Sequence, residues 1–254
     1  MATPKSHCLI LASSLHVADP KLLRPSGVID PAERADDTRR ALSFWLTRQD
    51  WFGDLVLVDN SGADLGQVLR DLPAAPGRHL EVLSFDASAD VACAGRSYGE
   101  LAIMRYANTH SEVLAGYTHF AKVNARLRVG NLDALMRVMP DDHDAVARLS
   151  HNLTWLSTPF VAFGRSFFYN KILPYALDHA DDSAGVYIEH AYASALLRAV
   201  AEGARWYPFS REPDLIGRRG LDGTSYRRGA LRRWLIDLGT RGYHRAHDTR
   251  SGET

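Results

Sequence analysis

Three basic residues interrupt an otherwise apolar stretch in the middle of the chain: Lys122, Arg126 and Arg128. An ammonium group and planar guanidinium groups bind diphosphates and carboxylates, and they neutralise charge on a departing phosphate. Two basic residues spaced two apart on a strand share one face, so the stretch predicts a phosphate-binding strand. An exposed edge strand carrying charge on its solvent face would show the same pattern. Composition alone leaves both interpretations open.

Glu189 and His190 stand at the start of an expected helix, beside aromatic residues. A carboxylate and an imidazole in such a place could supply a general base to a hydroxyl group, or hold the molecule that carries it. The alternative is an ordinary surface pair, with the carboxylate placed at the positive end of the helix.

Asp59, Asn60 and Ser61 follow the apolar run 55–58 directly. In open parallel sheets, ligands bind outside the carboxyl ends of the strands, so polar residues at this point are candidates for binding. The Asp59 carboxylate could accept hydrogen bonds from a ribose or a base. An Asx-turn with solvated side chains is the alternative.

The one formal Asp-x-Asp match, Asp142-His143-Asp144, precedes an expected strand instead of following it. Hard carboxylates bind Mg²⁺ or Mn²⁺, but a solvated loop is the simpler interpretation here, so we expect no metal site and no cofactor from these residues. A divalent metal would need another carboxylate pair. The sequence contains no P-loop, no dinucleotide fingerprint and no Gly-x-Ser-x-Gly elbow.

These candidates must be positioned by the elements that the apolar pattern predicts. Short apolar runs alternate with segments of helical spacing, which predicts an α/β fold: a mostly parallel sheet with helices on both faces. The expected strands are 8–12, 55–58, 80–85, 117–123, 144–149 and 160–162, and the expected helices are 32–49, 65–72, 101–110, 132–138, 166–176 and 187–201. Ser97 is the expected N-cap of the helix at 101–110, with Glu100 three residues on.

The chain shows no internal repeat and no low-complexity linker, so we expect a single domain over 1–254. A basic helix is expected from Arg227, and the polar run 240–254 is expected to fray. No apolar run approaches the roughly 20 residues that a membrane span needs.

Lys plus Arg and Asp plus Glu both number 30, so no overall charge field recruits nucleic acid or an anionic membrane. Cys8 and Cys93, the only cysteines, lie in apolar stretches typical of buried free thiols. These features favour a cytoplasmic protein, which would meet a lipid-linked acceptor as a peripheral protein at the inner face of the membrane.

Four segments of the chain, taken in order, resemble bacterial glycosyltransferases of capsule and O-antigen clusters. They are Val56–Gly62, the Gly-Arg-Ser-Tyr-Gly-Glu turn at 95–100, the run 119–131 and Tyr187–His190, with the loop 220–225 resembling a late glycine-serine loop. The run 119–131 is similar to the family signature Phe-x-Lys-x-Thr-Gly-Arg-Tyr-x-Val-x-Asn. Asn124-Ala125 stands where the family has Thr-Gly, and Arg96-Ser97 replaces Lys-Gly in the turn.

The resemblance implies a GT-A-like, Rossmann-type sheet that binds a nucleotide-sugar donor at the strand ends. By this likeness Lys122 and Arg126 would contact the donor phosphates, and Asn124 would replace a hydroxyl contact. Asp59 would lie on the nucleotide side and Glu189 at the acceptor or the reaction centre. The implied reaction transfers a sugar from a phosphate-activated donor to a hydroxyl of a glycan, or of a lipid-linked glycan.

Two other functions remain open from the sequence. A phosphoribosyl transferase would use the same cations on phosphoribosyl pyrophosphate, although the usual acidic pyrophosphate-binding signature is not evident. A non-catalytic carbohydrate or nucleotide-binding module would depend on aromatic platforms such as Trp155, Trp206 and Tyr207 more than on Glu189.

Overall fold

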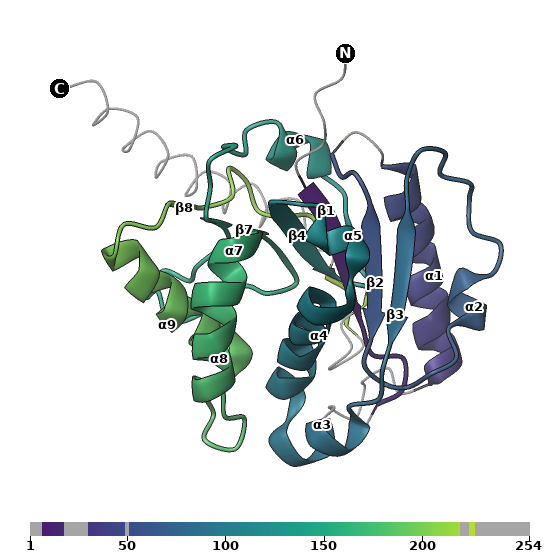
Figure 1. The fold of residues 1–254 in the computed structure, drawn as a ribbon, viewed down its shortest axis with the longest axis horizontal. Helices are drawn as coiled ribbons and strands as arrows, with labels where there is room; N and C mark the ends of the chain where they lie inside the picture. Colours follow the sequence, from purple (N-terminus) through teal and green to yellow (C-terminus); the bar gives the residue numbers. More distant parts are fainter. Residues whose placement is uncertain (1–6, 18–29, 49–50, 219–223, 227–254) are drawn as a thin grey trace.

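The computed structural model describes residues 7–17, 30–48, 51–218 and 224–226. Their main sheet has seven strands in the order β3-β2-β1-β4-β7-β6-β8 (Figure 1). Strands β1 to β4 are parallel, β7 runs antiparallel to both of its neighbours, and β8 is parallel to β6. The strands are β1 His7–Ser13, β2 Leu55–Asp59, β3 Leu80–Ser84, β4 His119–Asn124, β6 Ala145–Val146, β7 Phe160–Gly164 and β8 Trp206–Tyr207.

The register brings the ends of the four parallel strands to one edge of the sheet, which we call the carboxyl edge. Ser13 pairs with Asp59, Asp59 with Ser84, and Ala12 with Asn124. Because β7 is antiparallel, it begins at this edge, where Phe160 pairs with Val123. Polar residues that follow β1, β2 and β4, and those that precede β7, therefore meet at the carboxyl edge.

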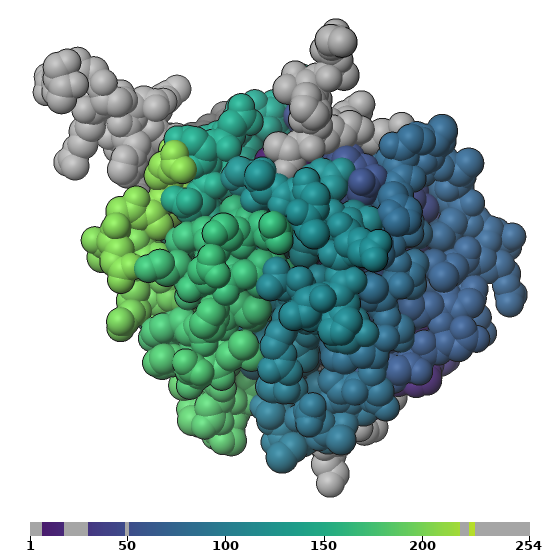
Figure 2. Space-filling view, viewed as in Figure 1, coloured from purple at the N-terminus to yellow at the C-terminus, as the bar shows by residue number. Residues whose placement is uncertain are grey.

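Helices cover both faces of the sheet. The helices are α1 Pro31–Thr47, α2 Gly66–Leu69, α3 Ser88–Ala94, α4 Arg96–His110, α5 Glu112–Ala115, α6 Leu132–Met136, α7 Arg165–Phe167, the π-helical turn η2 Phe168–Ile172, α8 Leu173–His179 and α9 Ile188–Ala201. Side chains alternate along a strand, so Leu9 and Leu11 pack with α1, α2 and α6, whereas Cys8 and Ile10 pack with α4, α5, α8 and α9. In the space-filling view α4 and α8 meet side by side over the second face (Figure 2).

The prediction of a mostly parallel α/β sheet flanked by helices is confirmed. None of the helices in the described residues is both long and apolar enough to cross a bilayer. Cys8 is buried as expected, but Cys93 is exposed, because α3 buries none of its side chains. The expected strand at 144–149 has ladder pairing only at Ala145–Val146. The predicted basic helix from Arg227 and the frayed tail lie outside the described residues.

The prediction of one strand carrying Lys122, Arg126 and Arg128 is wrong. Strand β4 ends at Asn124, and the chain turns there because the amide of Leu127 donates to the Asn124 carbonyl, at 2.8 Å. Arg128 then lies in β5 (Arg128–Val129), which pairs with β9 (Leu215–Ile216) in a separate two-stranded sheet. The apolar side chains of this segment pack into the core on the α1 side, which explains why the sequence resembles a continuous strand.

The predicted N-cap of α4 is also wrong. Gly95 is the N-cap, with φ of 91°, and Ser97 lies inside the first turn. Instead of capping α4, the Ser97 hydroxyl donates to Asp182 and accepts from the amide of Ile188, at 2.9 Å. Ser97 thereby joins the start of α4 to the start of α9.

Gly95→Ala is expected to destabilise the fold by about 1–3 kcal/mol, because an alanine would be strained at this φ. Its Cβ would also clash with the Asp182 carboxylate. Gly203→Ala is the matched control, since Gly203 also has a positive φ, of 99°, but its Cβ would meet nothing within 4 Å. Urea unfolding should show the larger loss for Gly95→Ala; equal losses would show that the contact with Asp182 is not restrictive.

Candidate functional site

Lys122 is the centre of a buried polar cluster at the carboxyl edge. Its neighbours on β4 alternate between the two faces, and its side chain, 2% exposed, points toward α4 and α9. The ammonium pairs with Glu100 at 2.7 Å, donates to the Asn124 amide oxygen at 2.7 Å and donates to the Thr158 carbonyl at 3.1 Å. An ammonium group has three N–H donors; hydrogen bonds to Asn124 and Thr158 use two of them, and the charge is paired with Glu100. Lys122 therefore ties β4 to α4 and to the segment that precedes β7.

Glu100 and Glu189 form a carboxylate pair beside Lys122. Glu100 lies in the first turns of α4, and Glu189 in the first turn of α9. Burial raises the pKa of Glu189, and the charge of Glu100 raises it further, while Arg96 and Lys122 act in the opposite direction. A partly buried carboxyl group whose pKa has been raised toward neutrality is suited to exchange protons with a bound hydroxyl.

Backbone contacts hold the two carboxylates in place. Asp182 accepts hydrogen bonds from the amide and the hydroxyl of Ser97, and the same hydroxyl accepts from the amide of Ile188. The amide of Leu156 donates to the Glu189 carbonyl, at 3.0 Å. The starts of α4 and α9 consequently lie next to each other.

His190 is fixed by its own helix start. Its Nδ1 accepts from the amide of Tyr187, at 3.2 Å, and this hydrogen bond assigns the remaining ring proton to Nε2. In this tautomer neither ring nitrogen is free to accept a proton from a hydroxyl. His190 is thus suited to donate a hydrogen bond to a ligand, and Glu189 is the better placed base.

Asp59, Asn60 and Ser61 are buried, and their side chains are used inside the protein. The Asp59 carboxylate accepts from the amides of Leu15 and Ser61, both at 2.9 Å, and from the Ser61 hydroxyl. Asn60 donates to the Gly99 carbonyl, at 3.0 Å. The segment thus adopts the Asx-turn of the alternative interpretation, but its side chains are buried instead of solvated, and it supports the loop after β1 and the start of α4.

A second cluster, the arginine cluster of Arg34 and Arg126, lies on the α1 side of the carboxyl edge. Arg34 is 5% exposed and donates through Nε and Nη2 to the Ser14 carbonyl, at 2.8 and 2.6 Å. Burial lowers its pKa, and the nearby charge of Arg126 lowers it further. Burial also lowers the pKa of Arg126. Arg34 is buried and Arg126 half-buried, so their charges repel each other, and a bound anion would relieve this repulsion.

The side chain of Arg126 is the better placed of the two for binding an anion. Its Nη1 is buried and has no hydrogen-bond partner among the described residues. The nearby acidic side chains of α1, Glu33 and Asp37, are both paired with Arg218, at 3.0 and 2.9 Å. A buried donor without a partner is costly, so a ligand oxygen at this point would be stabilised.

Sequence reasoning missed Arg34, Glu100 and Thr158 as members of the site. Arg34 carried a detectable signal, because it lies on the buried stripe of α1 together with Thr38, Ala41, Leu42 and Trp45. A cation on such a stripe needs a specific partner. Glu100 was expected to assist the cap of α4, and its pairing with Lys122 depends on the packing of α4 on β4. Nothing in the sequence marks the carbonyl of Thr158.

The structure places the remaining predicted residues as follows. Arg96 is exposed at the first position of α4, close enough to lower the pKa of Glu189. Arg128 is half-buried in the two-stranded sheet of β5 and β9. The candidate residues therefore separate into the carboxylate pair with Lys122 and Asn124 on one side of the carboxyl edge, and the arginine cluster on the other.

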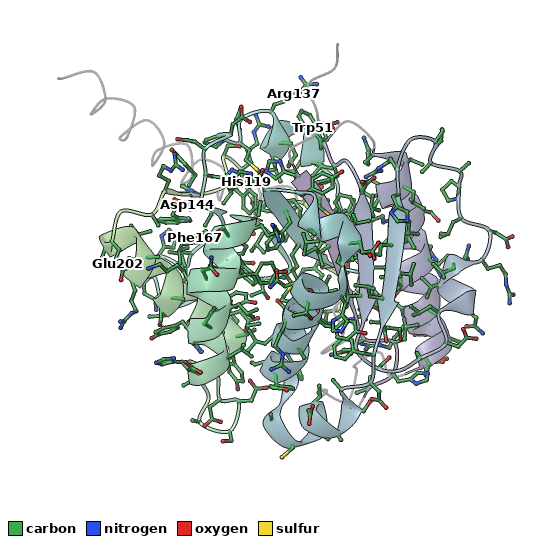
Figure 3. The ribbon with its side chains drawn as sticks, in the orientation of Figure 1. Trp51, His119, Arg137, Asp144, Phe167 and Glu202 are labelled. Atoms are coloured by element: carbon green, nitrogen blue, oxygen red, sulfur yellow. The ribbon has the colours of Figure 1, made fainter. Side chains whose placement is uncertain are left out.

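Asp142 and Asp144 lie at the opposite end of the sheet, before β6, as the sequence indicated. Both carboxylates pair with Arg205, through contacts of 2.9 Å and 3.6 Å. His119, which opens β4 at its amino end, donates through Nε2 to the carbonyl of His143, the residue before Asp144, at 3.2 Å, and Figure 3 labels both His119 and Asp144. Within the ranges that the structure describes, no group of three or more His, Cys, Asp or Glu side chains is arranged to hold a metal ion.

No family model and no curated protein matches the chain in sequence. Among solved structures, the chain resembles the inositol-1-phosphate CTP transferase from T. maritima, with 15% identity and a TM-score of 0.46 over 82% of this chain and 86% of that one. Mouse xyloside xylosyltransferase 1 is similar with 9% identity and a TM-score of 0.45, over 80% of this chain and 84% of that one. The bifunctional glycosyltransferase WbbM gives 8% identity and a TM-score of 0.49, over 83% of this chain and 40% of that one. These values describe a distant similarity of fold, from which no residue or activity is transferred.

Proposed function

We propose that this protein is a glycosyltransferase that moves a sugar from a nucleotide-activated donor to a hydroxyl of a glycan acceptor. The proposal rests on one observation: two chemically different clusters, one with carboxyl groups and one with guanidinium groups, lie at the same edge of the sheet. A carboxyl group with a raised pKa, Glu189, lies on one side, and the arginine cluster lies on the other. Transfer from a phosphate-activated sugar needs a proton acceptor for the incoming hydroxyl and cations for the departing phosphate.

The proposed roles follow the geometry. Arg126 binds the donor phosphates, with Arg34 behind it. The acceptor oxygen bonds to the anomeric carbon as the bond from that carbon to the phosphate oxygen breaks. The hydroxyl proton moves to Glu189, and the leaving phosphate keeps the bonding electrons and remains against the arginine cluster.

Lys122 takes a different role in this proposal from the phosphate contact that the resemblance implied. Because its charge is paired with Glu100 and it donates hydrogen bonds to Asn124 and Thr158, it acts as a positioning residue. It pairs with Glu100 beside Glu189, and its own charge acts against the rise in the pKa of Glu189. Asn124 lies at the end of β4, between the two clusters, and accepts a hydrogen bond from Lys122. Asp59, Asn60 and Ser61 support the nucleotide side of the edge through the loops that they fix.

The resemblance of the sequence to capsule and O-antigen enzymes supports a surface glycan as the acceptor, and such a glycan is assembled on a lipid carrier at the inner face of the membrane. The donor is a nucleotide sugar whose diphosphate reaches Arg126. Phosphoribosyl pyrophosphate would bind to the same arginine cluster without using Glu189 as a base.

Donor binding is tested by thermal shift with UDP, GDP, CDP and dTDP, and with phosphoribosyl pyrophosphate. A ligand present at about 100 times its Kd stabilises the folded protein by about 2.7 kcal/mol, which raises the Tm measurably. We expect at least one nucleoside diphosphate to do so. If none of these ligands raises the Tm, the donor site is wrongly assigned, and a shift with phosphoribosyl pyrophosphate alone would favour the phosphoribosyl transferase.

Arg126→Ala is expected to weaken binding of that nucleoside diphosphate by about 10- to 100-fold, since a hydrogen bond to a charged group contributes about 1.5–3 kcal/mol. Titration calorimetry measures the change. Arg105→Ala is the matched control, because Arg105 is exposed on α4 and its guanidinium contacts the Tyr98 side chain, away from the arginine cluster. Unchanged affinity in Arg126→Ala would exclude Arg126 from the donor site.

A further inference from the structure

Exposed apolar side chains gather next to Glu189. The exposed large hydrophobic residues of the described chain are Val138, Leu153, Trp155 and Tyr187. Three of these four belong to the hairpin 149–156 and to the residue that precedes α9. Trp155 is 38% exposed and Tyr187 is 44% exposed. A soluble protein that concentrates exposed apolar side chains in one place commonly uses them to bind a ligand.

The aromatic rings of this group contact one another. The Trp155 ring lies edge-on to His190, with 4.9 Å between centroids, and edge-on to Tyr187 at 6.3 Å. Tyr187 and His190 are nearly parallel, with 5.8 Å between centroids and an angle of 22°. Trp155, Tyr187 and His190 together make what we call the aromatic platform.

The hairpin that carries Trp155 is held rigidly. The amide of Ser150 donates to the Trp155 carbonyl at 2.8 Å, and the amide of Leu153 donates to the Ser150 carbonyl at 2.9 Å. Leu153 adopts a φ of 61°, a left-handed conformation that costs a leucine of the order of 1 kcal/mol or more. Leu156 is fully buried and anchors the end of the hairpin. The platform is therefore preformed, which lowers the entropic cost of binding.

The platform is continuous with the proposed reaction centre. Glu189 lies between Tyr187 and His190 in sequence, and the amide of Leu156, the residue after Trp155, donates to the Glu189 carbonyl. The platform therefore adjoins the first turn of α9, the turn that carries Glu189. The amide of Tyr187 donates to Nδ1 of His190, which leaves the ring proton on Nε2. His190 can therefore donate a hydrogen bond to a hydroxyl of the ligand.

We infer that the aromatic platform binds a pyranose ring of the acceptor. This inference rests on the proposed glycosyl transfer and names its acceptor subsite. A pyranose has an apolar face of C–H groups that stacks on aromatic rings, and hydroxyls around its rim that need hydrogen-bond partners. The platform offers exposed aromatic surface on Trp155 and Tyr187 and a hydrogen-bond donor at His190. A pyranose seated there directs a rim hydroxyl toward Glu189.

The test measures binding of fluorescently labelled protein to an array of immobilised pyranose oligosaccharides, with Trp155→Ala, Trp155→Phe and Val138→Ala compared with the wild type. Trp155→Ala is expected to weaken binding about tenfold or more, and Trp155→Phe to retain most of it because it keeps an aromatic ring. Val138→Ala, which changes an exposed apolar residue outside the platform, is expected to bind as the wild type does. Each protein is also tested for its thermal shift with nucleoside diphosphates.

The outcomes separate this inference from the proposed function. Loss of glycan binding in Trp155→Ala with an unchanged nucleoside diphosphate shift supports the platform. Wild-type protein that binds no oligosaccharide, or Trp155→Ala that binds as the wild type does, overturns it. Loss of both kinds of binding shows that Trp155 only maintains the fold and also overturns it. If no nucleoside diphosphate shifts any variant while glycan binding depends on Trp155, the proposed transfer fails and the platform stands.

Discussion

Glu189→Gln is expected to slow glycosyl transfer by about 10²- to 10⁴-fold, the range that a general base contributes. Glutamine keeps the size of the side chain but cannot accept the proton of the acceptor hydroxyl. The measurement is the initial rate of nucleoside diphosphate release in the presence of acceptor, for the wild type and the variant. Glu202→Gln is the matched control, because Glu202 caps the other end of α9 and its carboxylate is exposed (Figure 3).

The pH dependence gives this prediction a second measurement. Burial and then Glu100 raise the pKa of Glu189 above its ordinary value of 4.5. The ionised carboxylate is the base, so the wild-type rate should fall as the pH drops through a pKa higher than 4.5. The raised pKa also means that the folded protein binds the proton of Glu189 more tightly than the unfolded chain does. The stability that this proton contributes is present below pH 4.5 and is lost as the pH rises through the raised pKa of Glu189. Glu189→Gln stays neutral and should match or exceed the wild type in stability at neutral pH. A rate for Glu189→Gln within a few-fold of the wild type would exclude Glu189 as the base.

Lys122→Met is expected to lower the free energy of unfolding by about 3–5 kcal/mol, because removal of one partner leaves the other charge of a buried pair uncompensated. The ammonium is 2% exposed, and Glu100, its partner, has 18% of its side chain exposed. Denaturant unfolding measures the loss. Lys171→Met provides the matched control: its pair with Glu202 is exposed on both sides, and such pairs contribute about 0–1 kcal/mol.

A second variant separates the pair from the packing of the lysine side chain. In Lys122→Met/Glu100→Gln the unpaired carboxylate is gone, so part of the lost stability should return. A loss below about 1 kcal/mol in Lys122→Met would show that the charge pair is of little importance to the fold. A double variant no more stable than Lys122→Met would show that Lys122 acts through its contacts with Asn124 and Thr158 instead.

The sequence predicted the sheet and its candidate edge well, because both depend on local patterns. Apolar runs such as 55–58 end in turn-forming residues, and a parallel sheet brings such ends together. The Asx-turn at Asp59 was similarly available, since an aspartate next to serine and glycine forms that turn through its own neighbours.

What could not be predicted depends on contacts between distant elements. Lys122 was identified, but its partner Glu100 lies on a helix whose rotation is set by packing on β4. Arg126 and Arg128 were expected on one strand because nothing local distinguishes a strand from a turn whose apolar side chains still face the core. Trp155 was named only as a platform of a non-catalytic module, and its closeness to Glu189 arises from one backbone hydrogen bond between the hairpin and α9.

The most direct test of the proposed transfer is a measurement of nucleoside diphosphate release from UDP-, GDP-, CDP- and dTDP-sugars, in the presence and absence of pyranose oligosaccharides. We predict that one donor is consumed, that an oligosaccharide accelerates its consumption and that the product oligosaccharide gains the mass of one sugar. Binding of a nucleoside diphosphate without any turnover of its sugar, with every oligosaccharide present, would contradict the account and identify a binding module instead.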